Sequence, residues 1–115
     1  MIRISILMVV TVMAVAMAFG VQAQVEKGAA QMTLEGGSRG LVPFTHRDHQ
    51  ERLQDCMVCH AAFPQQKGSI EKLKAEGALK KKQVMNTLCI KCHKAEKKAG
   101  NKAGPVTCSQ CHVRE

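Results

Sequence analysis

The sequence has no tryptophan and no tyrosine, and three phenylalanines are its only large aromatic side chains. Large aromatic residues supply much of the buried area in small domains, so this composition cannot easily build an ordinary side-chain core. The same lack excludes the aromatic stacking surfaces that many nucleic-acid-binding proteins use, and no nucleic-acid-binding motif is present. A chain of 115 residues with this composition therefore needs a cofactor, a metal or cross-links for stability.

Charge is missing from one long stretch near the N-terminus. Residues 4–20 form an almost wholly apolar run after a single basic residue, Arg3. The run is short for a membrane span, and the small side chains among residues 21–23 match a signal-peptidase site. We predict that residues 1–23 are a cleaved secretory signal peptide and that residues 24–115 form one exported domain. The alternative is an uncleaved membrane anchor, but the basic flank of a stop-transfer segment is absent.

Cysteine and histidine are few but follow one pattern. All six cysteines and three of the five histidines form three Cys-x-x-Cys-His units. This signature is typical of c-type haem attachment, in which two thiols bond the vinyl groups and the next histidine ligates the iron. We predict three covalent haem c groups, held by the pairs Cys56 and Cys59, Cys89 and Cys92, and Cys108 and Cys111, with His60, His93 and His112 as proximal ligands.

Two other uses of these residues were weighed. Six cysteines in an exported chain can form three disulfides, but pairing inside each unit would close very small loops and leave the histidines unexplained. Zinc sites with two cysteines and two histidines would leave residues over, and the spacing does not match a zinc finger. Covalent haem accounts for every cysteine and for the histidine that follows each pair.

Three haems would also explain the composition and the charge. Without residues 1–23 the chain has 92 residues, with 16 Lys and Arg against 9 Asp and Glu, a formal balance of +7. Three haems carry six propionates, which would offset most of this excess, and the rest suits docking to an acidic redox partner. The porphyrins would form the core around which the side chains fold. The simplest interpretation of the lysine-rich stretches is a solvent-exposed basic face without a dedicated binding function.

The distal ligands can be counted. Two histidines remain, His46 and His49, so two of the haems can have two histidine ligands and one cannot. Met85 lies four residues before Cys89 on a predicted helix, and methionine is an axial ligand that raises the haem potential. Met85 is our candidate for the sixth ligand. Two alternatives stay open: Met85 fills space against a porphyrin, or one iron keeps an open position.

Short elements are predicted between the haem units. Residues 32–34 and 41–44 are apolar runs on either side of the turn-forming residues 35–40, which predicts a two-stranded antiparallel ribbon with Pro43 on an edge strand. Residues 46–54 are predicted to form a helix capped by Thr45. Residues 25–31 are predicted to be a loose leader.

Two more helices and a break complete the predicted elements. Ser69 is the expected cap of a helix from Ile70 to about Glu76, ended by Gly77. Residues 78–98 are predicted to form a second helix that carries Cys89 to His93. Residues 99–105 break the chain before the third unit.

The order of these motifs resembles a known family. Phe44, Thr45, His46 and His49, then Cys56 to His60 and two further haem units, are similar to the class III multihaem cytochromes: the cytochrome c3 group and its three-haem branch, cytochrome c7. The resemblance extends from about Met32 to His112. It implies a small, largely irregular α fold, cytochrome c3-like, with a short N-terminal two-stranded β ribbon, few helices and a core formed by three covalent haems.

The resemblance also implies ligand pairs. It pairs His46 with His60 on the first haem and His49 with His93 on the second. The third haem takes His112 and the residue four before the second unit, which is usually histidine and is Met85 here. That departure agrees with the count of histidines made above.

The function implied is electron transfer rather than catalysis. Members of this family are periplasmic electron carriers in anaerobic bacteria, so we expect a monomeric carrier in the periplasm, without a membrane span after cleavage. Its partners would be other redox proteins, such as acidic cytochromes, membrane quinol dehydrogenases or terminal reductases, and not nucleic acid. The alternative from another class is a haem-based redox enzyme or ligand sensor with one open iron. A third possibility is a module that docks permanently to a membrane oxidoreductase.

Overall fold

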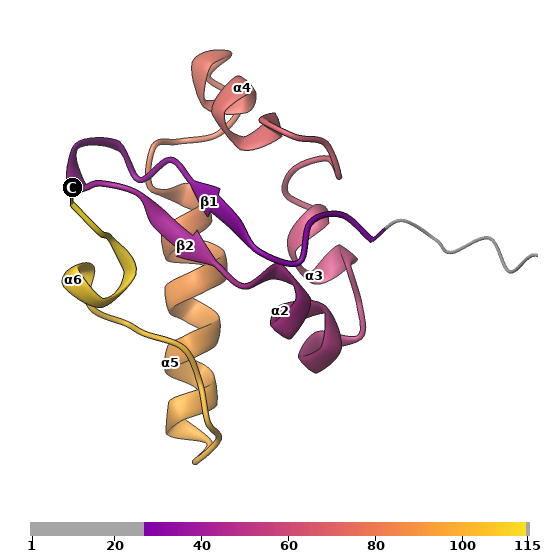
Figure 1. The fold of residues 1–115 in the computed structure, drawn as a ribbon, viewed down its shortest axis with the longest axis vertical. Coiled ribbons are helices and arrows are strands. Elements are labelled where there is room, and N and C mark those ends of the chain that lie inside the picture. The colour runs from indigo at the N-terminus through magenta and orange to yellow at the C-terminus, as the bar shows by residue number, and fades with distance from the viewer. Residues whose placement is uncertain (1–26, 115) are drawn as a thin grey trace, which may run out of the picture.

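A computed structural model describes residues 27–114, and the predicted signal peptide lies outside these residues. Short elements follow one another with long connections between them (Figure 1). In chain order they are β1 (Met32–Leu34), a 3-10 turn η1 (Gly37–Arg39), β2 (Val42–Phe44), α2 (His46–Leu53), α3 (Met57–His60), α4 (Ser69–Ala75), η2 (Met85–Ile90), α5 (Lys91–Lys98) and α6 (Cys108–Cys111).

The predicted N-terminal ribbon is confirmed. β1 and β2 pair antiparallel, with Met32 opposite Phe44 and Leu34 opposite Val42. These four apolar side chains are half-buried on one face, as the two-residue period of a strand requires, and Pro43 points to solvent. Figure 1 shows the ribbon in front of the helix formed by η2 and α5.

The helix predicted after the ribbon is confirmed over most of its length. α2 ends one residue early, because Gln54 adopts a left-handed conformation and closes the helix with its backbone N–H on Gln50. Thr45 takes the N-cap position as predicted, but its side chain makes no capping hydrogen bond. Its carbonyl oxygen instead accepts from the Nδ1–H of His49 at 2.8 Å. Thr45 therefore orients a histidine through its backbone.

Residues 27–31 are not a loose leader. The carbonyl of Lys27 accepts from the side chain of Gln50 at 2.6 Å, and the carbonyl of Ala30 accepts from the backbone N–H of Arg47 at 3.0 Å. A third carbonyl, that of Ala29, accepts from the His46 ring. The segment thus lies along the first turn of α2, whose N–H groups have no partner within the helix. Local sequence gave no sign of these long-range bonds.

α4 begins one residue earlier than predicted, and Ser69 is not its cap. The Ser69 hydroxyl donates to the carbonyl of Pro64 at 2.9 Å, and Gly68 takes the cap position with a positive φ. Gly77, also at positive φ, follows the helix end as predicted. Ile70 in this helix and Leu79 beyond it are the buried hydrophobic residues among those the structure describes, at 8% and 5% exposure. Side chains alone therefore form a very small core.

The predicted helix over residues 78–98 is confirmed only from Gln83 onward. Residues 78–82 form turns, and the side-chain oxygen of Gln83 accepts from the backbone N–H of Lys80 at 3.1 Å, which starts the helix there. η2 is wound more widely than an α-helix, with π-type turns, and continues directly into α5. Such wide turns are rare and often occur at functional sites. Here they carry Met85 and Cys89.

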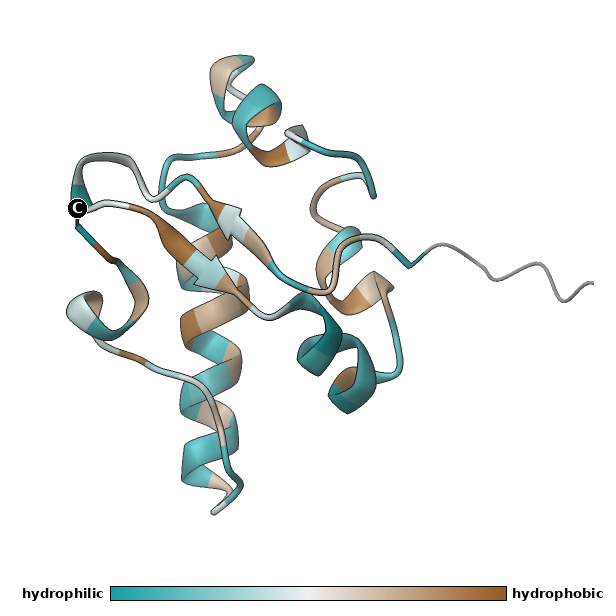
Figure 2. Ribbon diagram, viewed as in Figure 1, coloured by the Kyte–Doolittle hydropathy of each residue, from teal (hydrophilic) through white to brown (hydrophobic). Residues whose placement is uncertain are grey.

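The C-terminal end returns to the N-terminal ribbon. Leu41 and Val113 exchange two backbone hydrogen bonds, at 2.9 and 2.8 Å, as an isolated antiparallel bridge. This brings α6 to the side of the ribbon next to the turn between its strands (Figure 1). Apolar residues lie along β2 and along the η2–α5 helix, whereas α2 is almost wholly hydrophilic (Figure 2). Within residues 27–114, no helix is long and apolar enough to cross a membrane.

Candidate haem-binding centre

The first haem unit forms a single helical turn, α3, and faces a histidine from α2. The carboxylate of Asp55 accepts from the backbone N–H of Met57 at 2.9 Å, which starts the turn between Cys56 and Cys59. The rings of His46 and His60 lie across from each other with centroids 6.2 Å apart. The structure thus brings together the first pair of predicted ligands.

The second haem unit lies at the junction of η2 and α5 and faces the other histidine of α2. The centroids of the His49 and His93 rings are 6.1 Å apart. The three-residue interval places His46 and His49 on nearly the same face of α2 but offset along it, so the two rings meet different partners. The second pair of predicted ligands is therefore also brought together.

Both separations fit one iron between two imidazoles. A metal–imidazole bond of about 2 Å on each side, plus roughly 1 Å from each bonded nitrogen to its ring centre, places two such centroids about 6 Å apart. The observed 6.2 and 6.1 Å match the ligated arrangement.

All five histidines are oriented by the backbone in the same way. Each places Nδ1 within hydrogen-bond distance of a carbonyl oxygen, and a carbonyl can only accept, so Nδ1 carries the proton. The lone pair of the neutral ring is then on Nε2, which is free to ligate a metal. The acceptors, with distances from Nδ1, are Ala29 for His46 (3.0 Å), Thr45 for His49 (2.8 Å), Phe63 for His60 (3.2 Å), Pro105 for His93 (2.7 Å) and Gly40 for His112 (3.3 Å).

The third haem unit is held differently. α6 is one turn from Cys108 to Cys111, and His112 follows it in extended conformation. The ring of His112 packs against Gly36 so closely that a Cβ there would overlap its Nδ1. The bridge between Leu41 and Val113 fixes the next residue. The N-terminal ribbon therefore positions the third proximal histidine.

Met85 is half-buried at the start of η2, one turn before Cys89. Both spare histidines already face His60 and His93, so His112 faces no histidine. Met85 lies on the helix that carries the second unit, at the position where the resemblance implies the sixth ligand of the third haem. Its ligation of the third iron stays a prediction.

The cysteine pairs lie close to one another. All six cysteines are free thiols in the structure, and the described residues contain no group of three or more His, Cys, Asp or Glu side chains arranged as a metal-ion site. Burial raises the pKa of the Cys89 thiol, and the charges of Cys59 and Cys111 raise that pKa further. The Cys89 thiol of the second unit is therefore near a thiol of the first unit and a thiol of the third.

Several residues around the histidines were missed by sequence reasoning. Phe44 packs against His49 with ring centroids 4.5 Å apart, and Phe63 meets the ring of His60 edge-on at 5.1 Å. A Cβ on Gly104 would lie 2.5 Å from Cε1 and 2.8 Å from Nε2 of His93, so only glycine fits there. Proximity of Phe44 and Phe63 to the motifs was the one available signal. Nothing local marked Gly104.

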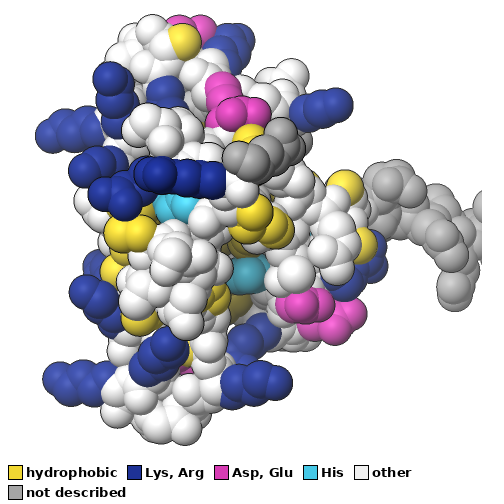
Figure 3. All heavy atoms as spheres, turned by 60° about the vertical axis from the view of Figure 1, so that its left-hand side comes forward, with side chains coloured by type: hydrophobic (Ala, Val, Ile, Leu, Met, Phe, Trp, Pro, Cys, Tyr) yellow, Lys and Arg dark blue, Asp and Glu magenta, His cyan; other side chains and the backbone are white. Residues whose placement is uncertain are grey.

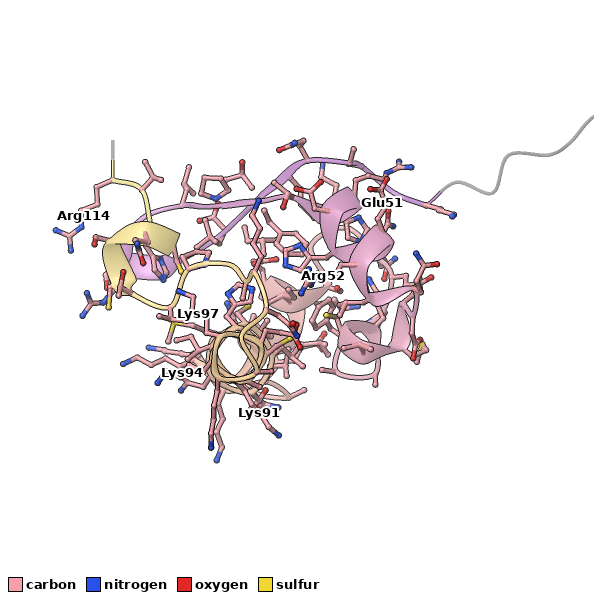
Figure 4. The ribbon with its side chains drawn as sticks, turned by 90° about the horizontal axis from the view of Figure 1, so that it is seen from below. Glu51, Arg52, Lys91, Lys94, Lys97 and Arg114 are labelled. Carbon is pink, nitrogen blue, oxygen red and sulfur yellow. The ribbon has the colours of Figure 1, made fainter. Side chains whose placement is uncertain are left out.

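The surface around the histidines is basic. Figure 3 shows two histidine side chains at the surface beside apolar groups, with lysine and arginine side chains around them. On α5, Lys91, Lys94 and Lys98 are spaced three and four residues apart and therefore share one face. Figure 4 shows Lys91 on the side of α5 away from the ribbon. The helix that carries His93 thus presents a row of positive charges to solvent.

Known proteins were compared with this chain. The solution structure of the triheme cytochrome PpcA from Geobacter sulfurreducens superposes with a TM-score of 0.53 at 27% identity, covering 75% of this chain and 100% of that one. PpcC, a cytochrome c7 from the same organism, gives 0.53 at 26% identity, covering 76% and 100%. A third structure, from the triheme cytochrome family of that organism, gives 0.52 at 26% identity, with 75% and 100% covered.

No curated protein matches the sequence. The family model described as "Cytochrome c7 and related cytochrome c" matches residues 42–113, which span all three haem units and both spare histidines. The predicted fold, a small α and irregular protein with an N-terminal ribbon, is confirmed by these matches. The chain belongs to the family of cytochrome c7 and related cytochromes c.

Proposed function

We propose that this protein transfers electrons in the periplasm on three covalently bound haem c groups. As a member of its family it is an electron carrier and not an enzyme. The haem, when bound, supplies a one-electron iron couple. The cysteine pairs of the three units would hold the haems through thioether bonds, and the histidines after them would be the proximal ligands.

The observation that carries this proposal is the pairing of the histidine rings. His46 opposite His60 and His49 opposite His93 both have the spacing of two imidazoles on one iron. Each ring is also held with Nε2 free, because its Nδ1 donates to a carbonyl. These residues therefore fit two haems with two histidine ligands each.

The third haem would have His112 and Met85 as its ligands. Two features support this: the count of histidines leaves none for this iron, and Met85 stands where the family usually has histidine. A thioether stabilises reduced iron more than an imidazole does, so the third haem would have a higher potential than the other two. The molecule would then have a spread of potentials.

The partners would be acidic redox proteins. The lysine face of α5 would be the surface on which an acidic partner docks. Charge complementarity of this kind raises association rates and weakens as salt screens it. Electron exchange with an acidic cytochrome should therefore slow with rising salt, and Lys91→Gln and Lys94→Gln together should reduce that dependence.

The location follows from the leader. An apolar run with a signal-peptidase site at residues 21–23 would direct export. Mass spectrometry of the protein from an exporting host should give the mass of residues 24–115 plus three haems. A mass with fewer than three haems would contradict the proposal.

Met85 is tested separately by ligand exchange and potential. Met85→Ala should open the third iron, so that carbon monoxide binds the reduced variant rapidly at one haem. Met85→His should give three haems with two histidine ligands and lower the third potential. Rapid binding of carbon monoxide to the unaltered protein would instead indicate an open iron and favour the ligand-sensor alternative.

A further inference from the structure

An ion pair joins the two helices that supply the histidines of the second site. The guanidinium of Arg52, near the end of α2, donates to Oε2 of Glu96 on α5 at 2.9 Å. The two residues are 44 positions apart in the chain. This is therefore a tertiary contact, and it differs in kind from a pair within one helix.

Glu96 is the centre of a small network. Its Oε2 also accepts from the side-chain amide of Asn101 at 3.0 Å, and its backbone carbonyl accepts from the N–H of Asn101 at 2.9 Å. The hydrogen bonds from Arg52 and Asn101 lower the pKa of the Glu96 carboxyl, so it is ionised at neutral pH. We call Arg52, Glu96 and Asn101 the interhelical network.

The network is placed symmetrically with respect to two ligands. Arg52 is three residues after His49, and Glu96 is three residues after His93. Three residues on a helix advance about 4.5 Å and return to nearly the same face. The ion pair therefore spans the same gap between α2 and α5 as the two rings, one turn further along both helices. Figure 4 shows Arg52 on the side of α2 that faces α5.

We propose that the interhelical network holds α2 against α5 and thereby positions His49 opposite His93, so that Arg52, Glu96 and Asn101 are positioning residues for the second haem. The inference rests on the proposed ligation of that haem by His49 and His93. Beyond that ligation, the interhelical network would limit how often His49 moves away from its position opposite His93. The first haem has no such contact to α5, because His46 and His60 belong to neighbouring helices.

An exposed ion pair contributes little to global stability, and this one is exposed at 52% for Arg52 and 35% for Glu96. The free energy for moving α2 away from α5 is a different quantity from the free energy of global unfolding. α2 is short and almost wholly hydrophilic, so little apolar burial holds it in place. A contact one turn from His49 then changes the fraction of time for which α2 moves away, even when unfolding of the whole protein is hardly affected.

The test uses two charge-removing variants, Arg52→Gln and Glu96→Gln, in the three-haem protein, with haem content checked by mass. The first readout is the rate at which carbon monoxide displaces His49 from the reduced second haem, resolved haem by haem with NMR. Both variants should increase that rate, by about two- to five-fold as for loss of an exposed pair. Asn101→Ala should give a smaller increase in the same direction.

The second readout separates positioning from charge alone. Removing a positive charge lowers a nearby haem potential and removing a negative charge raises it, so the two variants should shift the second potential in opposite directions. Positioning predicts that their carbon monoxide rates nevertheless change in the same direction. The double charge swap, Arg52→Glu with Glu96→Arg, should return the rate to nearly that of the unaltered protein.

The matched control is the ion pair between Lys72 of α4 and Glu76, the residue that follows this helix; it measures 3.9 Å with exposures of 71% and 54%. Glu76→Gln removes a similar charge far from the two ligand helices and should change neither readout. If Arg52→Gln and Glu96→Gln shift the potentials but leave the carbon monoxide rates unchanged, the network acts through charge alone and the proposal is wrong.

Failure of the proposed ligation would look different. It would appear in the unaltered protein, as spectra showing fewer than two low-spin haems with two histidine ligands. Two such haems in the unaltered protein, together with unchanged rates in every variant, would overturn the network's role and leave the proposed function standing.

Discussion

The first two haem sites and the third solve the same problem in different ways. At the first two, an imidazole from α2 faces the predicted proximal histidine, with ring centroids 6.2 and 6.1 Å apart, and α2 supplies the facing imidazole in both cases. At the third, the proximal histidine is held by the ribbon: His112 donates to the carbonyl of Gly40, and Val113 pairs with Leu41.

The difference shows what limits each site. A single short helix can place two ligands three residues apart, but a third ligand would need a further turn and a third direction. The chain instead fixes His112, the predicted third proximal ligand, through backbone pairing, and Met85 is the ligand proposed for its opposite side. The first two sites thus depend on α2, whereas the third depends on β1, β2 and the turn between them.

The strongest way to break this comparison is to remove whole haem units. Replacing Cys89 and Cys92 by alanine should prevent accumulation of a folded protein, because Cys89 is near thiols of both other units. Replacing Cys108 and Cys111 should leave a stable protein with two haems, because the first two sites do not use α6. Haem counting by mass spectrometry measures both. A stable two-haem product from the first pair of substitutions would contradict the central role of the second unit.

His49→Met should make the second site resemble the predicted third one. Exchange of one imidazole for a thioether should raise the potential of the second haem on the order of 100 mV, a fraction of the roughly 0.8 V over which axial ligands act. A redox titration followed haem by haem gives the value. The first haem is the internal control, since His46 and His60 are unchanged.

Gly104→Ala should disturb His93 without changing any ligand. Its new methyl group would overlap the imidazole ring, so either the ring or the loop must move. We expect a shift of the second potential on the order of tens of millivolts, with the third unaffected. Gly77→Ala is the control: it strains a positive φ with nothing near the added Cβ, so it should lower stability and leave all three potentials in place.

Val113→Pro tests the backbone support of the third site. Proline removes the N–H that donates to Leu41 at 2.8 Å, so one of the two bridge hydrogen bonds is lost. The expected result is faster amide exchange in the last residues and greater access of external ligands to the third haem. Unchanged exchange at Leu41 would indicate that the bridge does not hold His112.

The smallest expected effect is on pH dependence at the second site. The pKa of Glu96 is lowered by Arg52 and Asn101, so its contribution is fully present above the ordinary glutamate pKa and is lost as the pH falls through the lowered value. Carbon monoxide access to the second haem should rise in that acid range. Glu96→Gln should remove this part of the dependence while access to the third haem is the same in both proteins.

The haem units and the ribbon were predictable because each follows from short-range spacing, whereas the pairing of the histidines was implied by the family resemblance. The three Cys-x-x-Cys-His units identify haem attachment sites from the sequence alone, and the interval between His46 and His49 identifies two candidate ligands. The helix start at Gln83 and the role of Ser69 were missed, because a side-chain bond to a nearby backbone group decided each one. Propensity alone does not distinguish such local competition.

The long-range contacts were beyond sequence reasoning for another reason. The carbonyls of Ala29 and Gly40, the fit of Gly104 against His93 and the pair of Arg52 with Glu96 join segments whose separation in the chain carries no periodic signal. They follow only from how the ribbon, α2 and α5 come together. The residues that orient the predicted ligands are thus harder to predict from the sequence than the ligands themselves.

The hydrogen bonds from the five histidine rings to main-chain carbonyls have a consequence for sequence divergence. A carbonyl acceptor belongs to the backbone, so no side-chain substitution at that position can delete it. Most mutations therefore leave the orientation of the histidine rings unchanged, and the residues whose carbonyls accept these hydrogen bonds can change their side chains. The surface lysines can then diverge toward new partners while the five imidazoles keep their directions. A fold shared at 26–27% identity needs this kind of tolerance.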